Sequence, residues 1–280
     1  GGDYSNLLTK NITSIMKPDG WEVTNDDAGS AQRRAKVMAE ARLPKGSSDI
    51  QALASTDIPD LIEAGLLEKL DQSKFPNSKN ILPLFSMAEF PYFSPHIYSG
   101  KVVVYNPKII TTAPTGIADL WNPKYQGKVG IVDIQHNYTT MAAALVAGGK
   151  TGDFEKAKKA LLDLKKLKPT IYPTNEALAA ALKTEECGLA IMWKARAVQW
   201  QNAGINVETA APKEGIITYV SGFVIPKNAP NKAGAYAYLQ HQLDPRAQEA
   251  FAVDMGYMPT TTTAKIAPDL QKRIGFTEAE

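Results

Sequence analysis

The chain has 280 residues, of which 44% are hydrophobic and 21% are charged. Its 31 basic and 29 acidic residues leave a formal net charge of +2, which argues against a general nucleic-acid binder, because such proteins carry a strong basic excess. The composition excludes a disordered or collagen-like chain and is typical of one large or two medium globular domains. A single cysteine cannot form an internal disulfide, and the apolar stretches are too short for a membrane span.

Short β-rich runs alternate with helical segments along the first part of the chain, a pattern that predicts an α/β fold. Strands are predicted over residues 21–23, 49–53 and 101–105. Helices are predicted over residues 31–41, with Ser30 as the cap, and over 58–63, closed by Gly65. Residues 72–100 are rich in proline, serine and aromatic residues and are predicted to be a loop.

The second part of the chain continues the same alternation. Strands are predicted over residues 128–132, 188–193, 217–220 and 223–225. Helices are predicted over residues 117–120, 139–147, 177–182, 195–202, 232–242 and 246–253. Thr174 is the predicted cap of one helix, and Asp244 followed by Pro245 opens the last one. A further helix is predicted from the 3, 4, 3 spacing of four apolar residues, Phe154, Ala157, Leu161 and Leu164.

No motif in the sequence favours an enzyme. Phosphate-loop, GxGxxG, HExxH and GxSxG patterns are all missing, and the three histidines are far apart in the sequence. Cys187 directly precedes a predicted buried strand, so we interpret it as a packed side chain rather than a catalytic thiol. We therefore expect no catalytic residue, no metal and no cofactor.

Aromatic and polar residues gather instead at the ends of predicted strands. In open α/β sheets, ligands bind outside the carboxyl ends of the strands. Aromatic rings there offer apolar area and attract amines through cation–π contacts, and an arginine fork matches a carboxylate or phosphate. The residues in such positions are Phe93, Tyr98, Tyr138, Trp193, Lys194, Arg196, Tyr219 and Ser221.

Each of these residues also has a purely structural interpretation. Phe93 and Trp193 fit a hydrophobic core equally well, and Arg196 fits a surface or interlobe ion pair. Ser55, which precedes the helix at 58–63, fits a helix-capping role. The binding interpretation gains support because such residues recur at corresponding strand ends in both halves of the chain.

The order of several segments is similar to that in a known family. Thr115–Val129, which reads TGIADLWNPKYQGKV, resembles the segment that opens the second lobe of bacterial extracellular solute-binding proteins. The group that it resembles contains the spermidine/putrescine and iron(III) receptors of ABC importers. Further segments resemble this group in the same order, from a turn at residues 1–4 through 64–71, 104–107, 212–215, 223–227 and 243–245 to 256–260.

The resemblance implies a two-lobed, hinged α/β fold of the type II periplasmic-binding-protein (Venus-flytrap) class, each lobe a sheet flanked by helices. Lobe one would comprise residues 1–104 plus 223–280 and lobe two residues 107–221, with crossings near 105–106 and 222. Such a receptor captures a small organic solute by lobe closure and docks transiently on a membrane permease. The resemblance also implies a periplasmic monomer without nucleic acid, whose export signal and first strand are absent from the given chain.

The ligand class follows less directly from the resemblance. Iron(III) receptors of the group use adjacent tyrosines, and this sequence has no Tyr-Tyr pair. Polyamine receptors place an acid in the segment that matches 220–223, where this chain has Ser221. Burying a diamine without a carboxylate at each end is costly. A zwitterion such as a γ-aminobutyrate-like amino acid or an aminoalkylphosphonate therefore fits best, and a polyamine is the alternative ligand. A small-molecule hydrolase or lyase built on the same lobes is the alternative from another class of protein.

In this hypothesis Arg196 pairs with the acid end of the ligand, and Trp193, Phe93 and Tyr138 surround its apolar body. Asp3 would bind the amine. The full set of expected ligand-binding residues is Gly2, Asp3, Tyr4, Ser55, Phe93, Tyr138, Thr174, Trp193, Arg196, Tyr219 and Ser221.

Overall fold

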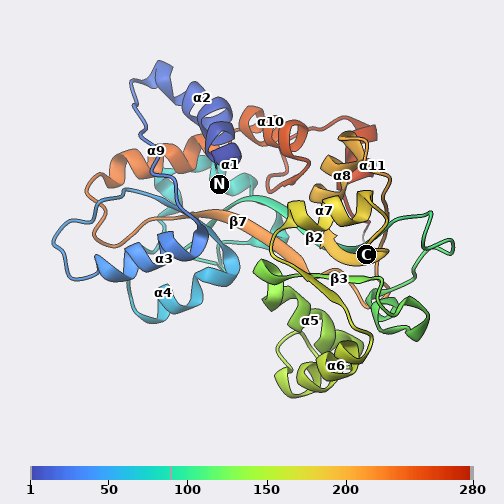
Figure 1. Cartoon of the computed structure of the whole chain (residues 1–280). Helices are drawn as coiled ribbons and strands as arrows, with labels where there is room; N and C mark the ends of the chain where they lie inside the picture. Colours follow the sequence, from blue (N-terminus) through green and yellow to red (C-terminus); the bar gives the residue numbers. More distant parts are fainter. Residues whose placement is uncertain (1, 89, 278–280) are drawn as a thin grey trace. The chain divides into compact units, whose positions relative to one another are not determined.

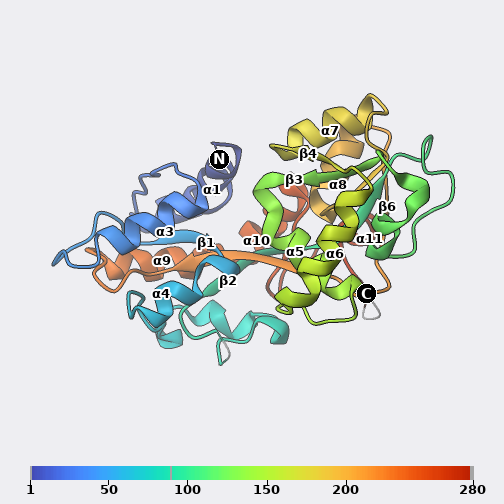
Figure 2. The same cartoon turned by 60° about the horizontal axis from the view of Figure 1, so that its bottom comes forward.

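The computed structural model describes residues 2–88 and 90–277, without the side chain of Asp3. The chain forms two compact units of mixed helix and strand (Figures 1 and 2). Unit 1 contains Gly1–Tyr98 and Tyr219–Gln271, and unit 2 contains Ser99–Thr218 and Lys272–Glu280.

Unit 1 is built on short antiparallel strand pairs flanked by helices. Its strands are β1 (Gln51–Ala54), the first residues of β2 (Ser94–Tyr105), most of β7 (Thr218–Val224) and β8 (Met258–Pro259). β1 pairs with β7, which places Ser221 opposite Ala54, and β8 pairs with the start of β2. Its helices are α1 (Gly2–Leu8), α2 (Ser14–Met16), α3 (Ser30–Ala39), α4 (Pro59–Glu63), α9 (Lys232–Gln242), α10 (Pro245–Met255) and most of α11 (Pro268–Ile274).

Unit 2 contains a mixed sheet whose parallel strands end at one edge. Its strands are the second part of β2, β3 (Val129–Val132), β4 (Thr170–Tyr172), β5 (Leu189–Trp193) and β6 (Glu208–Ala210). β3 runs parallel to β4 and β5, whereas β2 runs antiparallel to β5 and β6. Its helices are α5 (His136–Val146), α6 (Phe154–Lys166), α7 (Asn175–Lys183) and α8 (Lys194–Asn202), and α5 packs against α6 (Figure 2).

Local sequence explains where several helices begin. Thr174 caps α7 as predicted, because its Oγ1 accepts a hydrogen bond of 3.1 Å from the Ala177 amide. Asp244 likewise caps α10, with Pro245 in the first turn. α3 begins one residue earlier than predicted, since Ser30 is its first residue and Gly29 occupies the cap position.

Other predicted elements differ from the structure. Residues 72–100, predicted as loop, contain three 3-10 turns and the start of β2, and residues 117–120 form a 3-10 rather than an α-helix. The side chain of Phe154, placed on the apolar face of α6, is 69% exposed, because the buried side of this first turn is formed by Ala157. Gly2 to Tyr4, compared above with a turn, belong to helix α1.

The segments predicted as separate strands at 217–220 and 223–225 form the single strand β7. Gly222 keeps this strand continuous because a side chain there would collide with its neighbour. A Cβ atom would lie 2.2 Å from the Ser94 carbonyl oxygen and 2.6 Å from the Phe93 ring. Glycine therefore allows the close backbone approach here rather than marking a turn.

The division of the chain also differs from the predicted lobes. Residues 99–104 belong to unit 2, because Lys101 to Tyr105 pair with β5. Residues 219–221 belong to unit 1, because Ser221 pairs with Ala54 of β1. Residues 272–277 belong to unit 2 rather than to lobe one. The hinge positions near 105–106 and 222 remain predictions.

Candidate functional site

Two aromatic residues predicted to bind ligand meet at the carboxyl edge of the unit 2 sheet. Tyr138 lies in the first turn of α5, just after β3, and Trp193 is the last residue of β5. Their ring centroids are 4.5 Å apart at an interplanar angle of 85°. This edge-to-face arrangement is a favourable geometry for two aromatic rings. We call these two residues the aromatic pair.

A lysine that the sequence analysis did not single out lies against the aromatic pair. The Lys101 Nζ is 3.7 Å from the centroid of the Trp193 ring and 5.2 Å from that of Tyr138. Lys101 is only 1% exposed. Burial lowers the pKa of its ammonium well below the ordinary value. No ion pair joins it to a carboxylate among the residues whose side chains the structure describes.

Two amide side chains hold this lysine in place. The buried Gln135, which follows β3, accepts a hydrogen bond from Lys101 Nζ through its Oε1. The Gln135 Nε2 donates in turn to the Oδ1 of Asn175, the first residue of α7. Gln135, a neutral acceptor, thus takes one hydrogen bond from Lys101 Nζ, and no carboxylate among the described residues supplies a countercharge.

Thr174 and Arg196 belong to the same edge of unit 2. Thr174 is committed to capping α7. Arg196, in the first turn of α8, is 30% exposed and lies 3.9 Å from Glu176, while its Nη1 donates to Gln199 at 2.9 Å. Its buried Nε has no hydrogen-bond partner among the described residues.

Lys194 has a different role from the one suggested by its position. Its Nζ donates to the Gly275 carbonyl and lies 4.9 Å from the centroid of the Phe276 ring. These contacts hold residues 275–276 against the start of α8. They direct the Lys194 ammonium toward residues 275–276 rather than toward the aromatic pair.

In unit 1 the structure brings together Tyr4, Tyr219 and Ser221. The Tyr4 hydroxyl is 3.1 Å from Nδ1 of His96. Burial, followed by the neighbouring Tyr219, raises the pKa of Tyr4 above its ordinary value. Burial also raises the pKa of Tyr219, an effect that the Ser221 hydroxyl partly opposes. Ser221 itself is buried and donates to the Leu53 carbonyl at 3.4 Å.

The remaining predicted residues of unit 1 are less informative. Ser55 directly follows β1 and opens a 3-10 turn, one residue beyond the Ala54–Ser221 pair. Phe93 is 4% exposed and belongs to a core that includes Leu53, so it serves at least as a core residue. Gly2 and Asp3 begin α1, and the proposed amine contact of Asp3 concerns a side chain outside the described residues.

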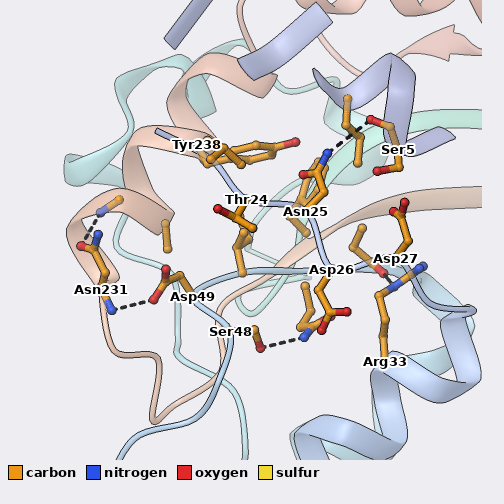
Figure 3. Close-up of a pocket in the computed structure, with 18 of the residues that line it drawn as sticks. Ser5, Thr24, Asn25, Asp26, Asp27, Arg33, Ser48, Asp49, Asn231 and Tyr238 are labelled. Atoms are coloured by element: carbon orange, nitrogen blue, oxygen red, sulfur yellow. Dashed lines mark hydrogen bonds between the residues drawn. The ribbon is translucent and has the colours of Figure 1, made fainter. Parts of the chain in front are cut away.

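A separate cavity of about 390 Å³ lies in unit 1 between residues 21–28 and residues 47–52 (Figure 3). We call it the slot. Arg33 of α3 bridges its two sides, because Nε donates to the Ala52 carbonyl at 2.7 Å and Nη1 donates to the Ala28 carbonyl. Tyr4 is the one member of the predicted ligand-binding set among its described lining residues. The slot therefore does not coincide with the strand-end residues.

The slot also explains why the strand predicted at residues 21–23 does not form. Those residues adopt no regular structure. β1 hydrogen-bonds with β7 on one side, and the slot separates it from the 21–28 segment. A strand is stable only when its backbone groups find partners in a neighbouring strand, so this prediction is wrong for the structure.

The structure describes no alternative chemical centre. Cys187 is buried, and burial raises the pKa of its thiol to about 12, which keeps it protonated and unreactive. Among the described residues, no group of three histidine, cysteine or acidic side chains is placed to hold a metal ion. In the same part of the chain, no helix combines the length and apolar character needed to cross a membrane.

The strand-end rule would also have found Gln135 and Asn175, two of the three residues that the sequence analysis missed, and Lys101 carries a signal of another kind. Gln135 and Asn175 follow β3 and β4 in the same way as Tyr138 follows β3. Lys101 stands at the start of a run of β-branched residues, and a charged residue opening a buried strand is itself an unusual signal.

Comparison with known proteins identifies the class. Residues 12–278 match the family described as bacterial extracellular solute-binding protein. The spermidine/putrescine-binding periplasmic protein of Escherichia coli (strain K12) is 29% identical over 276 residues, covering 94% of this chain and 79% of that protein. The gamma-aminobutyric acid-binding protein of Pseudomonas aeruginosa is 25% identical over 236 residues, covering 80% of this chain and 65% of that protein. A solved GABA receptor superposes with a TM-score of 0.86 at 22% identity, covering 98% and 85% of the two chains.

The chain therefore belongs to the family of bacterial extracellular solute-binding proteins. Its fold is the two-lobed α/β fold of these receptors, and both the resemblance and the fold class predicted from the sequence are confirmed. Its function class is that of a substrate-binding receptor of an ABC transporter, a class that binds and delivers solutes rather than transforming them.

Proposed function

We propose that this receptor captures a small amine-bearing solute, first a GABA-like amino acid or aminoalkylphosphonate and second a polyamine. The observation that carries the proposal is the carboxyl edge of unit 2, where the aromatic pair and Arg196 lie beside three helix N-termini. α8 begins directly after β5, and α5 and α7 follow β3 and β4 after short turns, so all three helices begin near the edge at which these strands end. Helix N-termini attract anions, so this edge suits the acid end of a zwitterion.

The relatives support both ligand classes. The GABA-binding and the spermidine/putrescine-binding relatives share an amine in their named ligands. Within unit 2, the basic residues Lys101 and Arg196 suit a ligand that also carries an acid, and for this reason our proposal places the zwitterion first. In our proposal Asp3 of unit 1 binds the amine, and the ligand favours lobe closure because it contacts both lobes. The loaded receptor then docks on its permease.

A melting screen tests this proposal. The purified chain is heated with 4-aminobutyrate, 3-aminopropylphosphonate, putrescine or spermidine. A ligand at 100 times its Kd stabilises the folded state by about 2.7 kcal/mol, which raises Tm by roughly 5–10 °C for a chain of this size. Failure of all four compounds to raise Tm would contradict the ligand class. Recovery of the ligand unchanged is expected, and its conversion would favour the hydrolase or lyase alternative.

Arg196→Ala tests the acid contact within the same proposal. We expect it to weaken binding of 4-aminobutyrate by about tenfold or more, because a charge-assisted hydrogen bond contributes about 1.5–3 kcal/mol. Arg246→Ala is the matched control, since Arg246 is an exposed arginine of α10 paired with Asp244 in unit 1. Equal affinity of Arg196→Ala and the unmodified chain in calorimetric titration would remove Arg196 from the site.

A further inference from the structure

We propose that Lys101, in its protonated form, places a cation of the chain itself against the aromatic pair and thereby selects a carboxylate or phosphonate over an ammonium at this end of the ligand. The inference rests on the proposed function in so far as it takes the unit 2 edge to be part of the ligand site. It goes further, because it assigns the choice between zwitterion and polyamine to one residue.

The geometry places the lysine where a ligand amine would otherwise bind. Aromatic rings attract a cation whose centre lies within about 6 Å of the ring centroid. The Lys101 Nζ meets this condition for both Trp193 and Tyr138, at 3.7 and 5.2 Å. When Lys101 is protonated, its ammonium therefore already makes the cation–π contacts that a ligand amine would otherwise make with the aromatic pair.

Charge makes the same position unfavourable for an ammonium from outside. A second cation bound to these rings would lie close to Lys101, and two unit charges about 4 Å apart repel strongly in a buried setting. The other charged groups at this edge include Arg196, the exposed Glu176 that pairs with it, and the exposed Asp133, which directly follows β3. Among the described residues, neither of these carboxylates forms an ion pair with Lys101, so neither is placed to offset a second ammonium at the rings.

The same arrangement leaves Lys101 suited to an anion. Among the described residues its one hydrogen-bond acceptor is Gln135 Oε1, and an incoming carboxylate or phosphonate oxygen would supply both a further acceptor and a countercharge. The link from Gln135 to Asn175 fixes the acceptor, so the ammonium is held in position before the ligand arrives.

Two probes that share an amine and a four-carbon length test the selection, namely 4-aminobutyrate and putrescine. Kd is measured for both by calorimetry with the full chain and two variants. The unmodified chain is expected to prefer 4-aminobutyrate by at least about tenfold. Lys101→Met, which keeps the length of the side chain and removes the charge, is expected to reduce this preference by at least about tenfold.

Gln135→Glu is the second variant and protects the test against a folding defect of Lys101→Met. It supplies an internal carboxylate to Lys101, so it should also reduce the preference for 4-aminobutyrate while retaining the pairing that holds the lysine. An unchanged ratio of the two Kd values in both variants, or tighter binding of putrescine by the unmodified chain, overturns the inference and leaves the receptor proposal intact. Binding of neither probe by the unmodified chain overturns the inference, and the proposed ligand class falls with it if 3-aminopropylphosphonate and spermidine also fail in the melting screen.

Discussion

His96 is a histidine enclosed by aromatic rings inside unit 1. Its ring centroid lies 4.4 Å from that of Phe251 and 5.3 Å from that of Phe223, and the Tyr4 hydroxyl lies against its Nδ1. Burial lowers the pKa of His96 from 6.5 to about 3. The folded protein therefore holds this imidazole neutral at every pH at which the receptor is expected to work.

This burial predicts a pH-dependent stability. Between pH 6.5 and 3 the unfolded chain binds a proton at His96 that the folded chain does not, so the free energy of unfolding falls as the pH drops. Between pH 7 and pH 5, His96 lowers the free energy of unfolding by about 2 kcal/mol. Urea unfolding should show that His96→Gln lacks this part of the loss, whereas His136→Gln, which alters an exposed histidine, retains it. Equal losses in His96→Gln and the unmodified chain would contradict the prediction.

At this scale the sequence predicted part of the arrangement of the candidate site, whose role in binding stays a prediction. Tyr138 and Trp193 could be found because they follow parallel strands, and the carboxyl ends of such strands share an edge. The pairing of Lys101 with Trp193 could not be found, since it depends on the register of β2 against β5. Lys194 and Arg196 are two residues apart, yet only tertiary contacts show that Lys194 points to Gly275.

At the scale of secondary-structure elements, Arg33 holds α3, β1 and residues 21–28 together. Its guanidinium donates to carbonyl groups on both sides of the slot. Leaving a partly buried carbonyl group without a hydrogen-bond donor costs free energy. The Arg33 side chain therefore stabilises backbone segments that have no neighbouring strand on the side of the slot.

Arg33→Ala is therefore expected to lower the free energy of unfolding by about 1–3 kcal/mol, since it leaves two carbonyl groups unsatisfied. Arg34→Ala is the matched control on the same helix. Arg34 makes an exposed ion pair with Asp60, and its loss should cost at most about 1 kcal/mol. Urea unfolding of both variants measures the difference, and equal effects would show that the bridge across the slot does not stabilise unit 1.

Most elements of the fold could be predicted from local patterns, and those that could not depend on neighbours. The helices capped by Thr174 and Asp244 follow from side-chain chemistry within one turn. The segment at 21–23 has a strand-like sequence but no partner, and β7 is continuous because Gly222 lies against β2. Pairing between distant segments is what single-sequence patterns do not contain.

At the scale of the whole molecule, lobe closure predicts a measurable compaction. A compact body of 280 residues has a radius of gyration of about 19 Å. In our proposal, a compound that raises Tm in the melting screen favours the closed form, so saturating amounts should reduce the radius measured by solution scattering toward that value. An unchanged radius at saturation would show that capture proceeds without closure.

The slot also has a kinetic consequence for strand β1. In an edge strand, alternate amide groups point toward the partner strand and away from it. The amides of β1 that point toward β7 exchange their hydrogens with solvent only when that strand pair separates. Those that point into the slot need no such separation, and neighbouring residues of one short strand therefore carry two widely different exchange lifetimes.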